Sequence, residues 1–173
     1  FSTTLRTHFD EFCKLNSDIT VCPVCGIGEL KKHTDDIRDQ YDHYLPKSLY
    51  PISAVNFKNL VPVCRECNSL EIKGSTDVVK VATKQKLFYL YDTHHMGISV
   101  SFRILVDDMD PNKIQWQVDF TNPQGKVDEI ESWNTIYKIR SRYVGFINAR
   151  LEGWYRHYWE YMNASAVSGF PDD

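Results

Sequence analysis

The amino-acid sequence predicts an α+β fold that is built on a four-cysteine metal ribbon and continues into an antiparallel strand pair and a long C-terminal helix. Three observations predict it. Two CxxC pairs at residues 22–25 and 64–67 frame a segment with the pattern of strand, loop, strand and helix. Residues 97–122 alternate apolar and polar side chains on both sides of a turn. Residues 132–163 carry apolar side chains at spacings of three and four, which is typical of an amphipathic helix.

The composition is that of an ordinary folded protein rather than a disordered or membrane-spanning one. Of 173 residues, 42% are hydrophobic and 25% are charged. No apolar run approaches the roughly 18 to 20 residues of a membrane span, and the first residues lack the apolar core of a signal peptide. We therefore expect a cytoplasmic protein with no membrane partner. The formal net charge is −3, but Lys and Arg outnumber Asp and Glu within residues 31–86, as contact with nucleic acid favours.

The chain divides into three predicted parts. Residues 1–20 hold a short amphipathic helix, because apolar residues recur there at helical spacing. Cys13 lies among these apolar residues and is interpreted as a small buried side chain rather than a metal ligand. Residues 21–75 hold the ribbon and its insertion. Residues 76–173 form an α+β extension to which the sequence assigns no role.

The four paired cysteines predict a structural zinc site. Cys22 and Cys25 form one knuckle, Cys64 and Cys67 form the other, and zinc binds thiolates at about 2.3 Å. Four sulfur ligands close the coordination sphere, so this ion should hold the fold together rather than catalyse. A redox role is the less favoured alternative, because it does not explain two matched knuckles. A plain ribbon has about 15 to 20 residues between its knuckles. Here residues 26–63 intervene, which indicates an inserted unit.

The inserted unit has the pattern of two strands and a helix. The stretch "IRDQYDHYL" alternates as a strand does and carries Asp42 and His43. Pro46 and Pro51 mark a loop, after which the apolar run "LVPVC" returns the chain as a second strand. The stretch "RECNSLEIK" then suits a helix that starts at the second knuckle and stops at Gly74.

These parts resemble an HNH endonuclease of the zinc-containing ββα-metal group. The resemblance is carried by Asp42 and His43 at the end of the first strand, Asn59 in "KNLVPVC" leading the second, and Asn68 in "CRECN" directly after the second CxxC. It covers roughly residues 20–75. The phrases "DHYLPKS" and "NLVPVCRECN" are also similar to HNH proteins that accompany ATPases in bacterial anti-phage systems such as Septu and some retrons.

The resemblance implies metal-dependent hydrolysis of the phosphodiester bonds of DNA. It assigns His43 as the general base that takes a proton from the attacking water. It assigns Asp42 and Asn68 as oxygen ligands of a catalytic Mg²⁺ or Mn²⁺. Some members of the family have His in place of Asn68, and Glu71 could substitute as an oxygen donor.

Three further roles follow from the same resemblance. Asn59 should bond backbone groups of the loop and keep His43 facing the substrate without touching metal. Lys47 and Lys73 should contact phosphates, although each has the alternative of an ordinary solvated lysine. An ATPase partner that delivers the substrate is expected as well.

Two other functions remain open at this point. One is a zinc-ribbon module that binds nucleic acid or protein and does not cleave. The other is an RNA nuclease, for instance one that cuts tRNA, because a metal ion and a base act on the phosphodiester of either nucleic acid.

Overall fold

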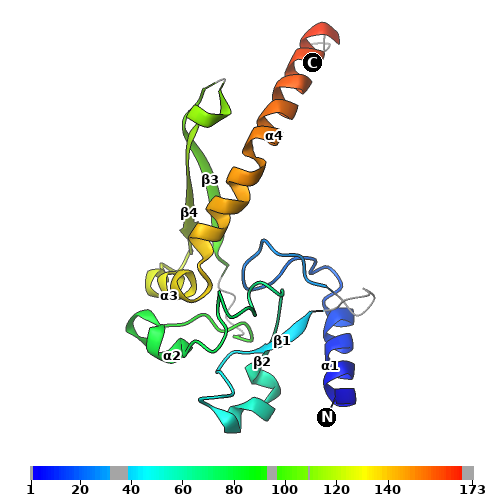
Figure 1. Cartoon of the computed structure of the whole chain (residues 1–173), viewed down its shortest axis with the longest axis vertical. Helices are drawn as coiled ribbons and strands as arrows, with labels where there is room; N and C mark the ends of the chain where they lie inside the picture. The colour runs from blue at the N-terminus through cyan, green and yellow to red at the C-terminus, as the bar shows by residue number, and fades with distance from the viewer. Residues whose placement is uncertain (1, 32–38, 93–96, 109, 169–173) are drawn as a thin grey trace. The chain divides into compact units, whose positions relative to one another are not determined.

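The computed structural model (Figure 1) describes residues 2–31, 39–92, 97–108 and 110–168. The fold is mixed α+β, as predicted, with two small sheets of two strands each and a long C-terminal helix. The residues group into two compact units, and each is described by itself. The units are Phe1–Ile98 with Thr121–Ile139, and Ser99–Phe120 with Arg140–Asp173. The predicted boundary at residue 75 therefore lies inside the first unit.

The first unit begins with α1 (Ser2–Leu15), which forms where the sequence predicts a helix. Phe9 and Cys13 are buried on its inner side, so the interpretation of Cys13 as a core residue is confirmed. Leu15 was expected on the same face but is 85% exposed. The helix ends at this residue, so its side chain no longer follows the buried face.

A two-stranded antiparallel sheet forms the centre of the first unit. β1 (Gln40–His43) pairs with β2 (Leu60–Val63), with His43 opposite Leu60 in the register. The two strands lie side by side in Figure 1, and all four residues of β2 are buried. The loop between them contains two short 3-10 helices, Pro51–Val55 and Phe57–Asn59. Strand, loop and strand thus follow in the predicted order, and residues 37–38 of the expected first strand lie outside the described residues.

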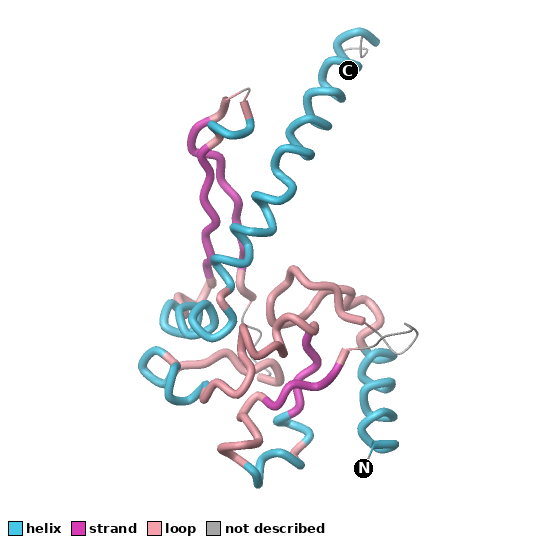
Figure 2. Tube along the Cα trace, viewed as in Figure 1, coloured by secondary structure: helices cyan, strands magenta, loops and turns pink. Residues whose placement is uncertain are grey.

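The helix expected after the second knuckle is not formed. Residues 65–75 are a succession of turns (Figure 2), so the structure lacks the regular third element of a ββα unit. Leu70, which would have anchored the helix, is 83% exposed and leaves the segment without an apolar face. Gly74 adopts a positive φ of 46° and donates its N–H to the Ser69 carbonyl, which closes a turn instead of capping a helix.

Two short helices complete the first unit. α2 (Val78–Val81) packs against α3 (Val127–Tyr137). The indole N–H of Trp133 donates to the Val24 carbonyl at 2.7 Å and so joins α3 to the first knuckle. α2 is four residues long, and no strand follows it within residues 82–92. A segment from the predicted extension therefore belongs to the body that carries the ribbon.

The second unit contains a hairpin in which β3 (Ser99–Val106) pairs with β4 (Gln115–Thr121), as the alternation predicted. The Arg103 guanidinium lies 2.6 Å from the Asp119 carboxylate and links the two strands. All eight residues of β3 are exposed. The apolar side chains of its alternating pattern are therefore not covered by the described part of the chain.

The C-terminal segment forms two helices where one was predicted. α3 gives way to α4 (Ile139–Ser168) at Lys138, whose φ of 52° and ψ of 38° are left-handed. An α-helix cannot continue through that conformation, so α3 ends there. α4 ends at Ser168, and residues 169–173 lie outside the described residues. No helix in the described ranges combines the length and the hydropathy that a membrane span requires.

Candidate metal centre and the adjoining polar site

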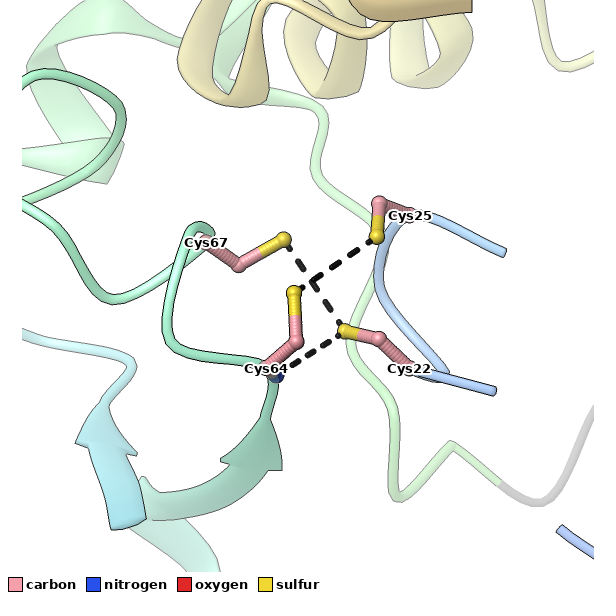
Figure 3. Close-up of side chains that lie close together, drawn as sticks. All are labelled: Cys22, Cys25, Cys64 and Cys67. Atoms are coloured by element: carbon pink, nitrogen blue, oxygen red, sulfur yellow. Dashed lines mark hydrogen bonds between the residues drawn. The ribbon is translucent and has the colours of Figure 1, made fainter. Parts of the chain in front are cut away.

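Four cysteine sulfurs converge in the first unit (Figure 3). The Sγ atoms of Cys22, Cys25, Cys64 and Cys67 all lie within 4.8 Å of one another, and all four residues are buried. Cys22 and Cys67 are 3.9 Å apart, and Cys25 and Cys64 are 3.8 Å apart. A tetrahedral ion with Zn–S bonds of about 2.3 Å requires sulfur separations of about 3.8 Å. These two separations match that value, and the four sulfurs are close enough together to hold a zinc ion.

The backbone around the first knuckle is shaped to bring these sulfurs together. Gly26 has a φ of 66° and donates its N–H to the Cys22 carbonyl at 2.8 Å, which closes the turn. A Cβ atom on Gly28 would lie 2.7 Å from Sγ of Cys64, so only glycine leaves room for that thiol. The N–H of Gly28 also points toward Sγ of Cys25 at 3.4 Å. The two glycines thus serve the cluster directly.

Hydrogen bonds within the cluster lower the pKa of Cys25 and Cys64 and raise the pKa of Cys22 and Cys67. The bond with the Cys22 thiol is the main reason that the pKa of Cys25 lies below its ordinary value. The same neighbour is the largest cause that lowers the pKa of Cys64 to about 7. Thiolate is the form that binds zinc, so two of the four ligands are predisposed to accept the ion.

A buried ion pair lies at the end of β1. Asp42 is buried, and the side chain of Lys73 is 0% exposed. Nζ of Lys73 lies 3.0 Å from Oδ1 and 2.9 Å from Oδ2 of Asp42, and it donates to the carbonyl oxygen of His43 at 2.7 Å. The expected contact of Lys73 with phosphate differs from this arrangement, because an ammonium group without solvent exposure does not meet a phosphate from solution.

The carboxylate of Asp42 is only partly satisfied. Burial raises its pKa above the ordinary value, and the positive charges of Lys73 and then of His43 oppose that shift. The imidazole of His43 is therefore close enough to Asp42 for the two charges to interact. Oδ2 is in ion-pair range of Lys73, but among the described residues no group donates a hydrogen bond to it with acceptable geometry. One oxygen of the carboxylate thus keeps lone pairs for another partner.

Asn59 holds the loop that follows His43. Its Oδ1 accepts from the N–H of Leu45 at 2.7 Å, and its Nδ2 donates to the Leu45 carbonyl at 3.1 Å. Its own carbonyl accepts from the N–H of Tyr44 at 2.9 Å. Asn59 is buried, and both the oxygen and the nitrogen of its side-chain amide bond the backbone. The sequence analysis expected contacts of this kind for this residue. Its part in catalysis remains a prediction.

Asn68, Lys47 and Glu71 are less constrained. Asn68 is half-buried, and Lys47 and Glu71 are exposed. Within the described ranges, the side chains of Asn68 and Lys47 make no hydrogen bond or ion pair with Asp42. Hydrogen bonds and ion pairs thus connect Asp42, Lys73 and the backbone of His43. They do not connect Asn68 or Lys47 to this group within the described ranges.

Tyr137 is a neighbour of this site that the sequence analysis missed. Burial, and next the negative charge of Asp42, raise its pKa well above the ordinary value, so the phenol lies near the carboxylate. It belongs to the last turn of α3, far from the cysteines in sequence. An aromatic residue in an amphipathic helix predicts core packing, and no sequence motif links Tyr137 to Asp42.

Comparison with known proteins gives partial similarity. Over 75 residues the chain is 42% identical to protein ea31 of Escherichia phage lambda, a match that covers 43% of this chain and 22% of that protein. Over 56 residues it is 38% identical to Septu protein PtuB of Bacillus thuringiensis, covering 32% of this chain and 19% of that protein. The chain thus spans about a fifth of the length of these curated relatives. No family model and no solved structure matches it.

Proposed function

We propose that this chain is a zinc-ribbon endonuclease of the HNH type, which hydrolyses phosphodiester bonds of DNA with Mg²⁺ or Mn²⁺. The observation that carries the proposal is the end of β1, where His43 follows a buried and ion-paired Asp42 while β2 runs directly into the second knuckle. A ribbon that only binds has no need of a buried carboxylate beside a histidine at this position.

His43 would act as the general base. Imidazole groups titrate near neutral pH, so a neutral ring can accept the proton of a water molecule that attacks phosphorus. The ring is half-buried, and His43 directly follows the buried Asp42 at the end of β1. Asn59 would keep the ring facing the substrate through its bonds to Leu45. Positioning of this kind is required because the base must lie within hydrogen-bond reach of the water.

Asp42 and Asn68 would hold the divalent cation. Carboxylate and amide oxygens are the ligands that Mg²⁺ and Mn²⁺ prefer. Oδ2 of Asp42 receives no hydrogen bond from a described residue, but Nζ of Lys73 lies 2.9 Å away, so the cation would share this carboxylate with the buried ammonium group. When bound, such an ion supplies Lewis-acid stabilisation of the charge that develops on the phosphate. Lys47 is exposed in the loop after β1, where its ammonium group can contact a phosphate of the substrate.

The cellular role proposed here is anti-phage defence in the cytoplasm. The support is the 38% identity to a Septu protein over 56 residues, together with a cysteine cluster that can hold zinc. The resemblance to HNH proteins that accompany ATPases extends this to an ATPase partner that delivers the nucleic acid. The modest net charge of −3 is consistent with a substrate that a partner brings.

Cleavage of supercoiled plasmid tests the proposal. Zinc-loaded protein with Mg²⁺ or Mn²⁺ should give nicked or linear DNA, and omission of the second metal should stop the reaction. His43→Ala should lower the rate by about 10²- to 10⁴-fold, because general-base catalysis contributes that much. His157→Ala is the matched control, since His157 is exposed on α4 and belongs to the second unit.

The outcomes separate the three functions. Equal cleavage by the wild type and His43→Ala removes the catalytic assignment. Cleavage of tRNA but not of plasmid replaces DNA by RNA as the substrate. If neither substrate is cut with the candidate ATPase present, while zinc is bound and the nucleic acid is retained in a binding assay, the chain is a binding module.

A further inference from the structure

The peptide group that follows His43 is held on both of its polar sides. Its carbonyl oxygen accepts from Nζ of Lys73 at 2.7 Å, and its N–H, which belongs to Tyr44, donates to the carbonyl of Asn59 at 2.9 Å. A peptide group is planar and rigid, so fixing both of its ends fixes the orientation of the chain at this point. The backbone that carries the imidazole is therefore clamped from two directions.

Lys73 reaches this peptide from a turn 30 residues further along the chain. Its ammonium group has three N–H donors, and it lies within 3.0 Å of three oxygens: Oδ1 and Oδ2 of Asp42 and the carbonyl of His43. The side chain is 0% exposed, so water does not compete for these donors. One buried cation thus contacts two consecutive residues of the proposed active site.

We propose that Lys73 is a positioning residue of the proposed nuclease, which ties the carboxylate of Asp42 to the backbone of His43. It thereby fixes the strand end that presents the imidazole. This inference rests on the proposed function. It replaces the phosphate contact that the sequence analysis expected of Lys73.

The chemistry of the pair explains why lysine is needed. A buried carboxylate without a partner is strongly disfavoured, and Nζ of Lys73 lies within 3.0 Å of both oxygens of the buried Asp42. A neutral residue of the same length, such as methionine, would fill the space but release both the carboxylate and the peptide. The change should therefore disturb the position of His43 more than it disturbs binding of the substrate.

The test compares Lys73→Met with Lys80→Met, whose side chain is 81% exposed on α2 and contacts no proposed site residue. Plasmid cleavage gives kcat and KM. Histidine ring signals in the NMR spectrum give the position of His43, which is assigned by its absence from the His43→Ala spectrum. We expect Lys73→Met to lower kcat at least tenfold with KM within twofold, and to shift or broaden the His43 signal. Lys80→Met should match the wild type in all three.

A double variant covers the case in which Lys73→Met does not fold. Asp42→Asn combined with Lys73→Met leaves no unpaired buried charge, so the ribbon should keep its zinc. It should show the same displaced His43 signal as Lys73→Met. A double variant whose His43 signal matches that of the wild type would overturn the inference.

The NMR readout also separates this inference from the proposed function. If the wild type cuts no nucleic acid, the nuclease proposal fails and the position of His43 is still measured. A His43 signal that moves in Lys73→Met and not in Lys80→Met then supports the positioning role. A signal that is identical in the three proteins overturns it.

Discussion

The ribbon region and the region of hairpin and α4 are organised by different interactions. Around the ribbon the buried residues include four cysteines and three polar side chains, namely Asp42, Asn59 and Lys73. In the second unit every residue of β3 is exposed, and aromatic side chains such as Trp154 project from α4. A buried cysteine cluster and buried polar contacts therefore order the first region, whereas strand pairing and helix packing order the second. Equivalent substitutions should have unequal effects in the two regions.

Cys64→Ser should have the largest effect. Removing one ligand should release the zinc and unfold the ribbon while α4 keeps its helical signal. Structural zinc contributes about 10–16 kcal/mol in small domains, which matches or exceeds the roughly 5–15 kcal/mol that stabilises a typical protein. Elemental analysis and circular dichroism measure the two effects. Cys13 is a buried cysteine outside the cluster, so Cys13→Ser should retain one zinc per chain. Full zinc content in Cys64→Ser would contradict the assignment of four thiolate ligands.

Asn59→Ala should have the next largest effect. The substitution leaves the N–H and the carbonyl of Leu45 without their partner, and buried unsatisfied groups cost about 1–3 kcal/mol each. We expect a loss of about 2–4 kcal/mol in the free energy of unfolding, measured with urea. Asn148→Ala on the exposed side of α4 should change it by less than about 0.5 kcal/mol. Equal stability of the two variants would show that the loop does not depend on the amide.

Replacing a glycine by alanine should lower the free energy of unfolding in the first region and raise it in the second. Gly28→Ala brings a Cβ atom within 2.7 Å of Sγ of Cys64, and crowding of this kind costs about 1–3 kcal/mol. Gly153→Ala meets nothing within 4 Å and lies inside α4, where alanine is favoured over glycine by about 0.8–1.0 kcal/mol. Urea unfolding and zinc retention in a competing chelator measure both. A destabilising Gly153→Ala would reverse the expected contrast.

Ile104→Thr should have the smallest effect on stability. Ile104 is 45% exposed on β3, so the change should alter the free energy of unfolding by less than about 0.5 kcal/mol. It should lower self-association at high concentration, because it removes apolar surface from an open strand edge. Light scattering measures that change. Val61→Thr is the same kind of exchange in the buried β2, and it should lower the free energy of unfolding by about 1–3 kcal/mol. Equal losses at the two positions would remove the distinction between the regions.

Local spacing predicted the parts of the fold that depend on neighbouring residues. The CxxC pairs, α1, both strand pairs and a helical C-terminus follow from patterns within short windows of sequence. The prediction of a helix after Cys67 was wrong. The segment lacks a buried apolar face, as the exposure of Leu70 shows. The break at Lys138 had no signal, because neither proline nor glycine marks that left-handed residue.

The candidate site was predictable where one residue meets the backbone of a nearby loop. The contacts of Asn59 with Leu45 are of this kind. The burial of Lys73 was not predictable, since lysine is almost always exposed and its partner Asp42 lies 31 positions earlier. Tyr137 lies still further from Asp42 in the sequence. Pairing between remote segments is decided by the assembled fold, and one sequence alone does not reveal it.

The two halves of the metal centre are made at different times. Cys22 and Cys67 are 45 positions apart, so a ribosome synthesises the whole of β1 and its loop between them. Until the later thiols emerge, no cage exists and the imidazole of His43 sits on an open chain. A covalent cross-link across a loop of this length offsets about 4 kcal/mol of chain entropy, and coordination by an ion imposes the same constraint. If the cluster holds zinc, chains made without the metal should therefore be full-length but unclosed.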